Sequence, residues 1–323
     1  MEYFSEREGS LVPRDKELLT DAARDGIGVL IRVRAANHSF ALDYPIRCNR
    51  CSHREISRSN EQDFWDALGA VVPELKGWPR DRLPSGISQE EPLSPLQIYD
   101  AIEFCYSRVA KPREVRVETN RISDMILLSA SRALGDAPRH IHLSLDKTVG
   151  RKEFREDIEE IFRRNGMAYQ LTEEGRVERL LPPEFDDLAA VGESRTEEDE
   201  LDRLLNTAWT KFRDPSLETR REALEALWDA WERLKTTWPG RDKKAQAAAM
   251  LNDAAGTDSP KFLRALEKEA SELTLLGNNL RIRHSETTQE ILATSEHVDY
   301  MFLRMSSLIR LILSARQMVG VQT

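Results

Sequence analysis

The chain has 323 residues and a formal net charge of -9 at pH 7, with 56 acidic against 47 basic side chains. This acidic balance argues against a protein that coats nucleic acid non-specifically, but it leaves room for a small cationic site. No apolar run is long enough to span a bilayer, the N-terminus lacks a signal-peptide pattern, and three cysteines do not make a disulfide framework. The sequence therefore predicts a cytoplasmic protein of two or three domains that does not contact a membrane.

The first predicted module, residues 1–80, combines helices with short strands. Apolar residues at helical spacing predict a helix over 16–34 and a second helix that begins after Asn60. Alternating side chains over 40–47 predict a short strand or one arm of a hairpin.

One group in this module has zinc-ligand chemistry. Cys48, Cys51 and His53 are residue types that bind zinc, but a closed structural site needs four ligands and the sequence has no second CxxC or HxxxH. Thiols without a metal are the favoured interpretation, and zinc remains the alternative.

The second predicted module, residues 94–182, follows a stretch rich in Pro, Ser and Gly over 79–95. Ser94 and Pro95 have the residue types of a helix N-cap and first turn. Helices are predicted over 122–134 and 153–164, and a β-hairpin over 167–180. A hairpin after a helix is the outline of a winged helix. Acidic residues are mixed with the basic ones, so a structural or protein-binding role is favoured over DNA reading.

An acidic stretch over 183–199 predicts a linker, and residues 200–323 predict an all-helical bundle. Helical stripes with cap residues between them divide this region into antiparallel helices. Ser259 and Pro260 are predicted to open the longest of these, and Ser295 to cap the last.

The end of the long helix changes from apolar to polar over the run Leu273 to Glu286. If the helix continues, His284 extends its buried stripe, Asn279 and Arg283 share one flank, and Arg281 lies on the other. A histidine between two guanidinium groups has the chemistry to move a proton beside a phosphate.

Other catalytic signatures are missing from the sequence. It contains no P-loop, no dinucleotide-binding glycine pattern, no HExxH and no Gly-x-Ser-x-Gly. Its carboxylates show no cluster of the kind that holds two metal ions. We therefore expect no cofactor and no catalytic metal.

Two short motifs carry a resemblance to a known family. Gly277-Asn278-Asn279 and Ile282-Arg283-His284-x-Glu286, between two long helices, resemble the C-terminal domain of AbiJ-like abortive-infection proteins, which act in antiphage defence. These domains belong to the HEPN superfamily. The resemblance extends to Trp231–Lys235 and, at the N-terminus, to Tyr3–Arg7.

The resemblance implies a mainly α protein in which N-terminal α+β modules, one of them winged-helix-like, precede a HEPN-like bundle. It implies a homodimer that cleaves RNA without metal, as the effector of an antiphage or toxin system under a phage-derived trigger or regulatory partner. Arg283, His284 and Asn279 would be catalytic, and Asn278, Arg281 and Glu286 would contact the substrate.

Two alternatives remain open. The common HEPN pattern places four to six residues between Arg and His, whereas here Arg283 adjoins His284. This departure favours a catalytically inactive HEPN dimer that binds nucleic acid or a partner. The third reading is a winged-helix DNA-binding regulator.

Overall fold

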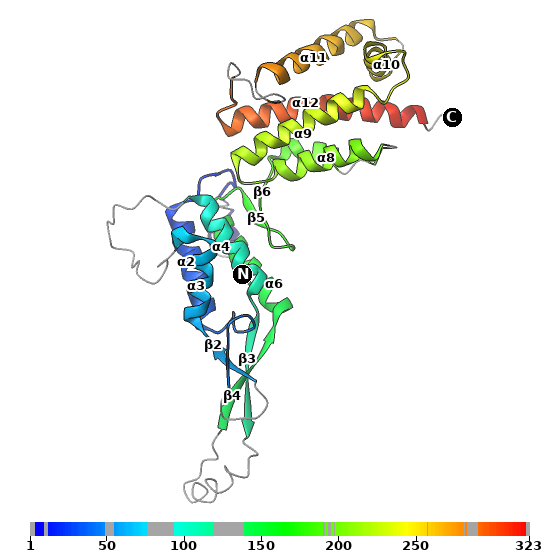
Figure 1. Ribbon diagram of the computed structural model, residues 1–323. Helices are drawn as coiled ribbons and strands as arrows, with labels where there is room; N and C mark the ends of the chain where they lie inside the picture. Colours follow the sequence, from blue (N-terminus) through cyan, green and yellow to red (C-terminus); the bar gives the residue numbers. More distant parts are fainter. Residues whose placement is uncertain are drawn as a thin grey trace, which may run out of the picture. The chain divides into compact units, whose positions relative to one another are not determined.

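The computed structural model describes residues 4–9, 12–48, 55–75, 94–118, 139–189, 191–192, 195–196, 198–256, 258–280, 282 and 290–320. The chain divides into two compact units, Met1–Glu178 and Arg179–Thr323 (Figure 1). The described residues are mainly helical with small two-stranded sheets, as predicted. None of their helices has both the length and the apolar character needed to cross a bilayer.

The first unit surrounds one hydrophobic cluster. Its elements are α1 (Phe4–Arg7), α2 (Asp21–Ala36), β1 (Pro45–Arg47), β2 (Ile56–Ser59), α3 (Glu61–Val71), η1 (Pro73–Leu75), α4 (Pro95–Arg108), β3 (Lys111–Glu118), β4 (Arg139–Asp146), α6 (Lys147–Arg164), β5 (Tyr169–Leu171) and β6 (Val177–Arg179), whose last residue begins the second unit. Buried side chains of α2, α3, α4 and α6 meet in this cluster. Both predicted N-terminal modules therefore contribute to one core.

Local capping explains where several of these helices begin. The Asn60 side chain accepts a hydrogen bond from the Asp63 amide, and Ser94, the predicted N-cap, forms a capping box with Gln97. The start predicted at residue 16 is wrong, because Thr20 caps α2 and the helix begins at Asp21. The helix predicted over 122–134 lies outside the described residues.

Two strand pairs were not predicted in full. The strand expected over 40–47 is confined to β1, and its partner β2 was missed. The sequence reading also missed the antiparallel ribbon of β3 and β4, in which Lys111 lies opposite Asp146 and Glu118 opposite Arg139. Alternation of Ile141, Leu143 and Leu145 was the available signal.

A helix followed by a hairpin is present where it was predicted. Asp146 caps α6, which therefore begins six residues before the predicted start, and the strands β5 and β6 pair after it. The finer assignment of a winged helix stays a prediction.

The second unit is built around α9. Its elements are η3 (Pro183–Phe185), α7 (Asp186–Ala189), α8 (Asp199–Phe212), α9 (Leu217–Lys235), α10 (Lys243–Ala255), α11 (Pro260–Asn279) and α12 (Ser295–Gly320). Trp228 and Trp231 of α9 are fully buried, and α9 packs against α8, α10 and α12. From α8 onward, the described part of this unit contains helices and no strand (Figure 1). The helical prediction for residues 200–323 is confirmed for these residues.

Candidate functional site

The polar run singled out in the sequence begins where α11 ends against α9. Gly277 is buried, and a Cβ at this position would come within 2.2 Å of Trp228 Nε1. The same indole nitrogen donates a hydrogen bond of 3.0 Å to the Leu273 carbonyl. Glycine is therefore required here because the α11 backbone lies directly on the Trp228 ring.

The helix stops earlier than the helical projection assumed. Its last residue is Asn279, and the amide of the C-cap residue Leu280 donates to the Leu276 carbonyl at 2.9 Å. The projection that placed His284 on the buried stripe assumed a helix longer than α11, and His284 itself lies outside the described residues. The inference that Arg281 and Arg283 lie on opposite flanks of the helix rested on the same assumption.

The segment after α11 closes at its base. The Glu290 amide donates to the Asn279 carbonyl at 3.3 Å, so the chain returns to the point where the helix ended. Ile282 is 3% exposed and belongs to the core of the second unit. We refer to residues 280–289 as the site loop. Arg281, Arg283, His284 and Glu286 lie outside the described residues, and their roles stay predictions.

The two predicted site residues that are described lie on the outgoing side of this loop. Asn278 and Asn279 are both exposed at the last turn of α11. The backbone carbonyl of Asn279 receives the closing hydrogen bond from Glu290. The Asn279 side chain is therefore attached to a backbone that is fixed both by α11 and by the bond from Glu290.

The returning side of the site loop is also held by α9. Arg221 Nε donates to the Leu292 carbonyl at 2.8 Å. The Thr294 hydroxyl accepts from the His297 amide at 3.3 Å, next to Ser295, which is the first residue of α12 rather than its predicted cap. One helix, α9, therefore anchors both ends of the site loop, through Trp228 on one side and Arg221 on the other.

A cluster of buried charge lies beside the returning end, and the sequence reading missed it. Arg179 makes two hydrogen bonds, of 2.8 and 2.9 Å, to the Asp299 carboxylate. Arg220 donates to the Ser295 hydroxyl at 2.7 Å and lies 3.7 Å from Asp299. The two arginine side chains are only 1% and 3% exposed. The signal was Arg220 itself, which lies on the apolar stripe of α9 that continues at Ala223 and Leu224.

The CxxC region gives no metal centre among the described residues. Cys48 is the only member of the group Cys48, Cys51 and His53 that is described. No three His, Cys, Asp or Glu side chains in the described part of the chain are placed to hold a metal ion. Cys105 is completely buried, and burial raises the pKa of its thiol.

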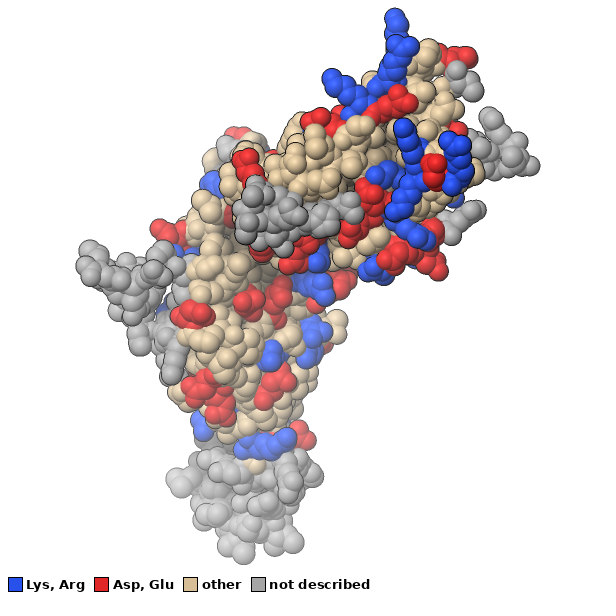
Figure 2. Space-filling model, turned by 45° about the horizontal axis from the view of Figure 1, so that its top comes forward, with Lys and Arg blue, Asp and Glu red and all other residues tan. Residues whose placement is uncertain are grey.

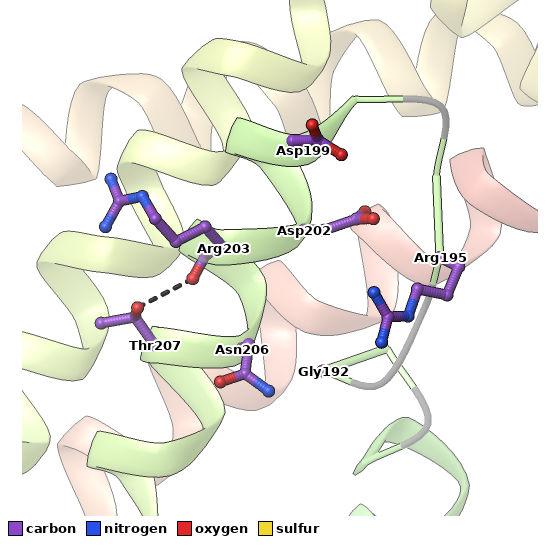
Figure 3. Close-up of a pocket in the computed structure, with 7 residues that line it drawn as sticks. All are labelled: Gly192, Arg195, Asp199, Asp202, Arg203, Asn206 and Thr207. Carbon is purple, nitrogen blue, oxygen red and sulfur yellow. Dashed lines mark hydrogen bonds between the residues drawn. The ribbon is translucent and has the colours of Figure 1, made fainter.

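A polar hollow of about 480 Å³ opens beside α8. Arg195 and Asp202 face it from the same side of α8, whereas the guanidinium of Arg203 extends away from them (Figure 3). Asp202 accepts from the backbone and hydroxyl of Thr196, and Arg203 pairs with Glu200 at 2.6 Å. Since acids balance bases in this hollow, we assign it no ligand. Its lining residues are Gly192, Arg195, Asp199, Asp202, Arg203, Asn206 and Thr207.

Comparison of the chain with protein-family models, curated proteins and solved structures found no match.

Proposed function

We propose that the second unit is a HEPN-type, metal-independent endoribonuclease and that the protein is the effector of an antiphage or toxin system. The observation that supports this is the closed base of the site loop, where Glu290 bonds to Asn279. Asn279 and Glu290, the residues on either side of the segment that contains Arg283 and His284 in the sequence, are thus held close together. Catalytic groups that are held in a defined position lower the entropic part of a reaction barrier.

The proposed chemistry needs one base, one acid and a cation. The ribose 2′-hydroxyl attacks the adjacent phosphorus, and the bond from phosphorus to the 5′-oxygen breaks. A histidine takes the proton from the 2′-hydroxyl, and a second acid gives one to the departing oxygen. In this scheme His284 transfers the proton and Arg283 stabilises the charge on the phosphate oxygens. Asn279 orients the histidine, while Asn278, Arg281 and Glu286 contact the RNA.

The second acid is the reason for proposing a homodimer. Each chain has one histidine in the site loop, and a two-fold axis would bring a second copy to the same cleft. Leu275 and Ile291 flank the loop and are 53% and 47% exposed. Apolar side chains on both sides of a polar loop are compatible with a partner surface around it.

The test is cleavage of total RNA by the purified protein in the presence of a chelator. His284→Ala should lower the rate by about 10²- to 10⁴-fold, because it removes proton transfer. His297→Ala is the matched control, since His297 is an exposed histidine in the first turns of α12. Its rate should equal that of the wild type. Wild-type cleavage by His284→Ala would contradict the assignment.

A second candidate function rests on the spacing of Arg283 and His284, which departs from the common HEPN pattern. In this alternative the bundle is an inactive dimer that binds nucleic acid or a regulatory partner. RNA binding without cleavage, combined with equal toxicity of wild type and His284→Ala during phage challenge, would favour it.

A further inference from the structure

Two acidic side chains of α6 find their partners on other elements of the first unit. Toward α2, the Glu153 carboxylate lies 3.4 Å from Arg34 Nη1, and Asp157 pairs with the same guanidinium. Glu153 also accepts from Lys111 Nζ at 2.6 Å. These acidic side chains of α6 are therefore neutralised by cations of α2 and β3, and not by the cations of α6 itself.

The cations of α6 line a hollow of about 470 Å³ in the first unit. Lys147, Arg151 and Arg155 recur at every fourth residue, so they form one row along the helix. Lys152 lies beside the row. The complete lining is Tyr106, Lys147, Thr148, Arg151, Lys152, Arg155 and Glu173. We call this set the α6 hollow.

Two contacts hold the opposite wall of the α6 hollow in place. Gly175, in the turn between β5 and β6, has a φ of +86°, and a Cβ there would come within 2.2 Å of the Tyr106 ring. The Tyr106 hydroxyl donates to the Glu173 carbonyl at 2.6 Å. The turn therefore rests on the end of α4, which packs beside α6 (Figure 1).

Arg151 is held in the α6 hollow without losing its charge. Its Nε and Nη2 donate to the carbonyls of Tyr106 and Ser107 at 3.3 and 3.1 Å. Its guanidinium also lies 5.5 Å from the Tyr106 ring centre. Carbonyl oxygens orient a guanidinium but do not neutralise it, so a planar donor is presented with its positive charge intact.

The other cations of the hollow are only partly balanced. Arg155 pairs with Glu173 at 3.0 Å, and Lys152 lies 4.0 Å from Glu156. The Glu173 and Glu156 side chains are 77% and 61% exposed, and such surface pairs are weak. Among the described residues, Lys147 has no ionic partner. Four cations thus face two loosely held carboxylates, on a chain whose net charge is -9.

We propose that the α6 hollow binds the phosphodiester backbone of a single-stranded nucleic acid. The Nη1 group of Arg151, which is left over by the two carbonyl bonds, the Lys147 and Lys152 ammonium groups and the Thr148 hydroxyl all suit phosphate oxygens. At 1.5 Å of rise per residue, the row from Lys147 to Arg155 extends about 12 Å. A row of that length exceeds one phosphate group and matches a strand that presents several. This site lies in the first unit and does not depend on the proposed nuclease.

The proposal can be tested by fluorescence anisotropy of the full chain with a labelled 2′-O-methyl oligonucleotide of about 12 residues. This probe has no free 2′-hydroxyl, so it reports binding without cleavage. The variant Lys147→Gln/Lys152→Gln should weaken binding by about tenfold or more at low salt. For a single strand, the slope of log affinity against log salt should fall in magnitude by about 1.4, or 0.7 for each lost cation.

The matched control is Lys243→Gln/Lys244→Gln in α10. It removes the same charge from two exposed lysines of the second unit and should bind within about twofold of the wild type. Wild-type affinity in Lys147→Gln/Lys152→Gln, or an equal loss in both double variants, would overturn the proposal. If millimolar adenosine monophosphate displaced the oligonucleotide completely, the α6 hollow would be a pocket for a single nucleotide, and the proposal of a bound strand would be wrong. Binding should be unchanged in His284→Ala, so failure of the nuclease proposal would leave this result intact.

Discussion

The ends of the site loop and the α6 hollow use arginine in opposite ways. Beside the site loop, Arg179 and Arg220 are almost completely buried and share the Asp299 carboxylate. In the α6 hollow, Arg151 bonds to carbonyls, and the pairs around it are exposed. Basic and acidic side chains are interspersed over the visible surface (Figure 2). The number of cations in a region therefore does not tell whether its arginines stabilise the fold or are available to a ligand.

The two groups of arginines differ in the partners and the burial that each acquires when the chain folds. A buried arginine must keep its carboxylate, because an unpaired buried charge strongly destabilises the fold. A half-buried arginine held by carbonyls, such as Arg151, can bind a ligand at little cost in stability. Substitutions near the site loop should therefore change folding and function together, whereas substitutions in the α6 hollow should change binding alone.

The largest effect is expected for Asp299→Asn. This change keeps the size of the side chain but removes the negative charge that the buried Arg179 and Arg220 share. The free energy of unfolding should fall by about 3–5 kcal/mol. Urea titration followed through the fluorescence of the buried tryptophans would measure it, with Asp258→Asn at an exposed position as the control. A loss no larger than in the control would remove the proposed distinction between the two regions.

An intermediate effect is expected for Gly277→Ala. The added methyl group would collide with the indole of Trp228, so α11 must move away from α9. We expect a loss of about 1–3 kcal/mol in stability and, with the end of the loop displaced, reduced RNA cleavage.

The matched glycine is Gly26 in α2, where a Cβ would find its nearest neighbour, Ile161, at 3.7 Å. Gly26→Ala should leave stability unchanged or raise it by about 0.5–1 kcal/mol, because alanine suits a helix better. Equal destabilisation by both changes would show that the contact with Trp228 is not what selects glycine at position 277.

The smallest effect is expected for Glu153→Gln in the first unit, and it should depend on pH. The hydrogen bond from Lys111, opposed by burial and aided by Arg34, lowers the pKa of the Glu153 carboxyl below its ordinary value of 4.5. A carboxyl with a lowered pKa stabilises the fold at any pH above its ordinary, unfolded-state pKa. This contribution is lost as the pH falls through the folded-state pKa.

The difference between wild type and Glu153→Gln should therefore be present at neutral pH, remain below about 1 kcal/mol, and disappear as the pH falls through the lowered folded-state pKa of Glu153. Acid unfolding followed by circular dichroism would measure it. Glu174→Gln, at an exposed position of the β5–β6 turn, should show no such difference. A difference that grew on acidification would contradict the assignment of the Glu153 pairs.

The helices of the second unit could be predicted closely because their signals are local. Ser259 and Pro260 open α11, and the apolar stripe from Leu266 to Leu273 is buried as its spacing indicated. The end of α11 was less predictable. Helical periodicity does not mark where a helix stops, and the polar run after Asn279 contains no glycine or proline to end it.

What the sequence could not reveal depends on partners that are distant in the chain. The acids of α6 seemed to cancel its cations, and only the folded positions of Arg34 and Lys111 show that Glu153 is neutralised from outside the helix. The pairing of Arg179 with Asp299 likewise joins residues 120 positions apart. The ribbon of β3 and β4 was different, because its alternation was visible and was overlooked.

The closed base of the site loop has a consequence for the length of that loop. Ten residues separate Asn279 from Glu290, whose backbone groups bond to each other, and Ile282 between them is buried in the core. The entropy of closing a flexible loop grows only with the logarithm of its length, by about 0.6 kcal/mol for each doubling. If the residues after Ile282 behave as such a loop, an insertion there should cost little folding free energy, and a strict requirement on their number would have to come from the chemistry proposed for them.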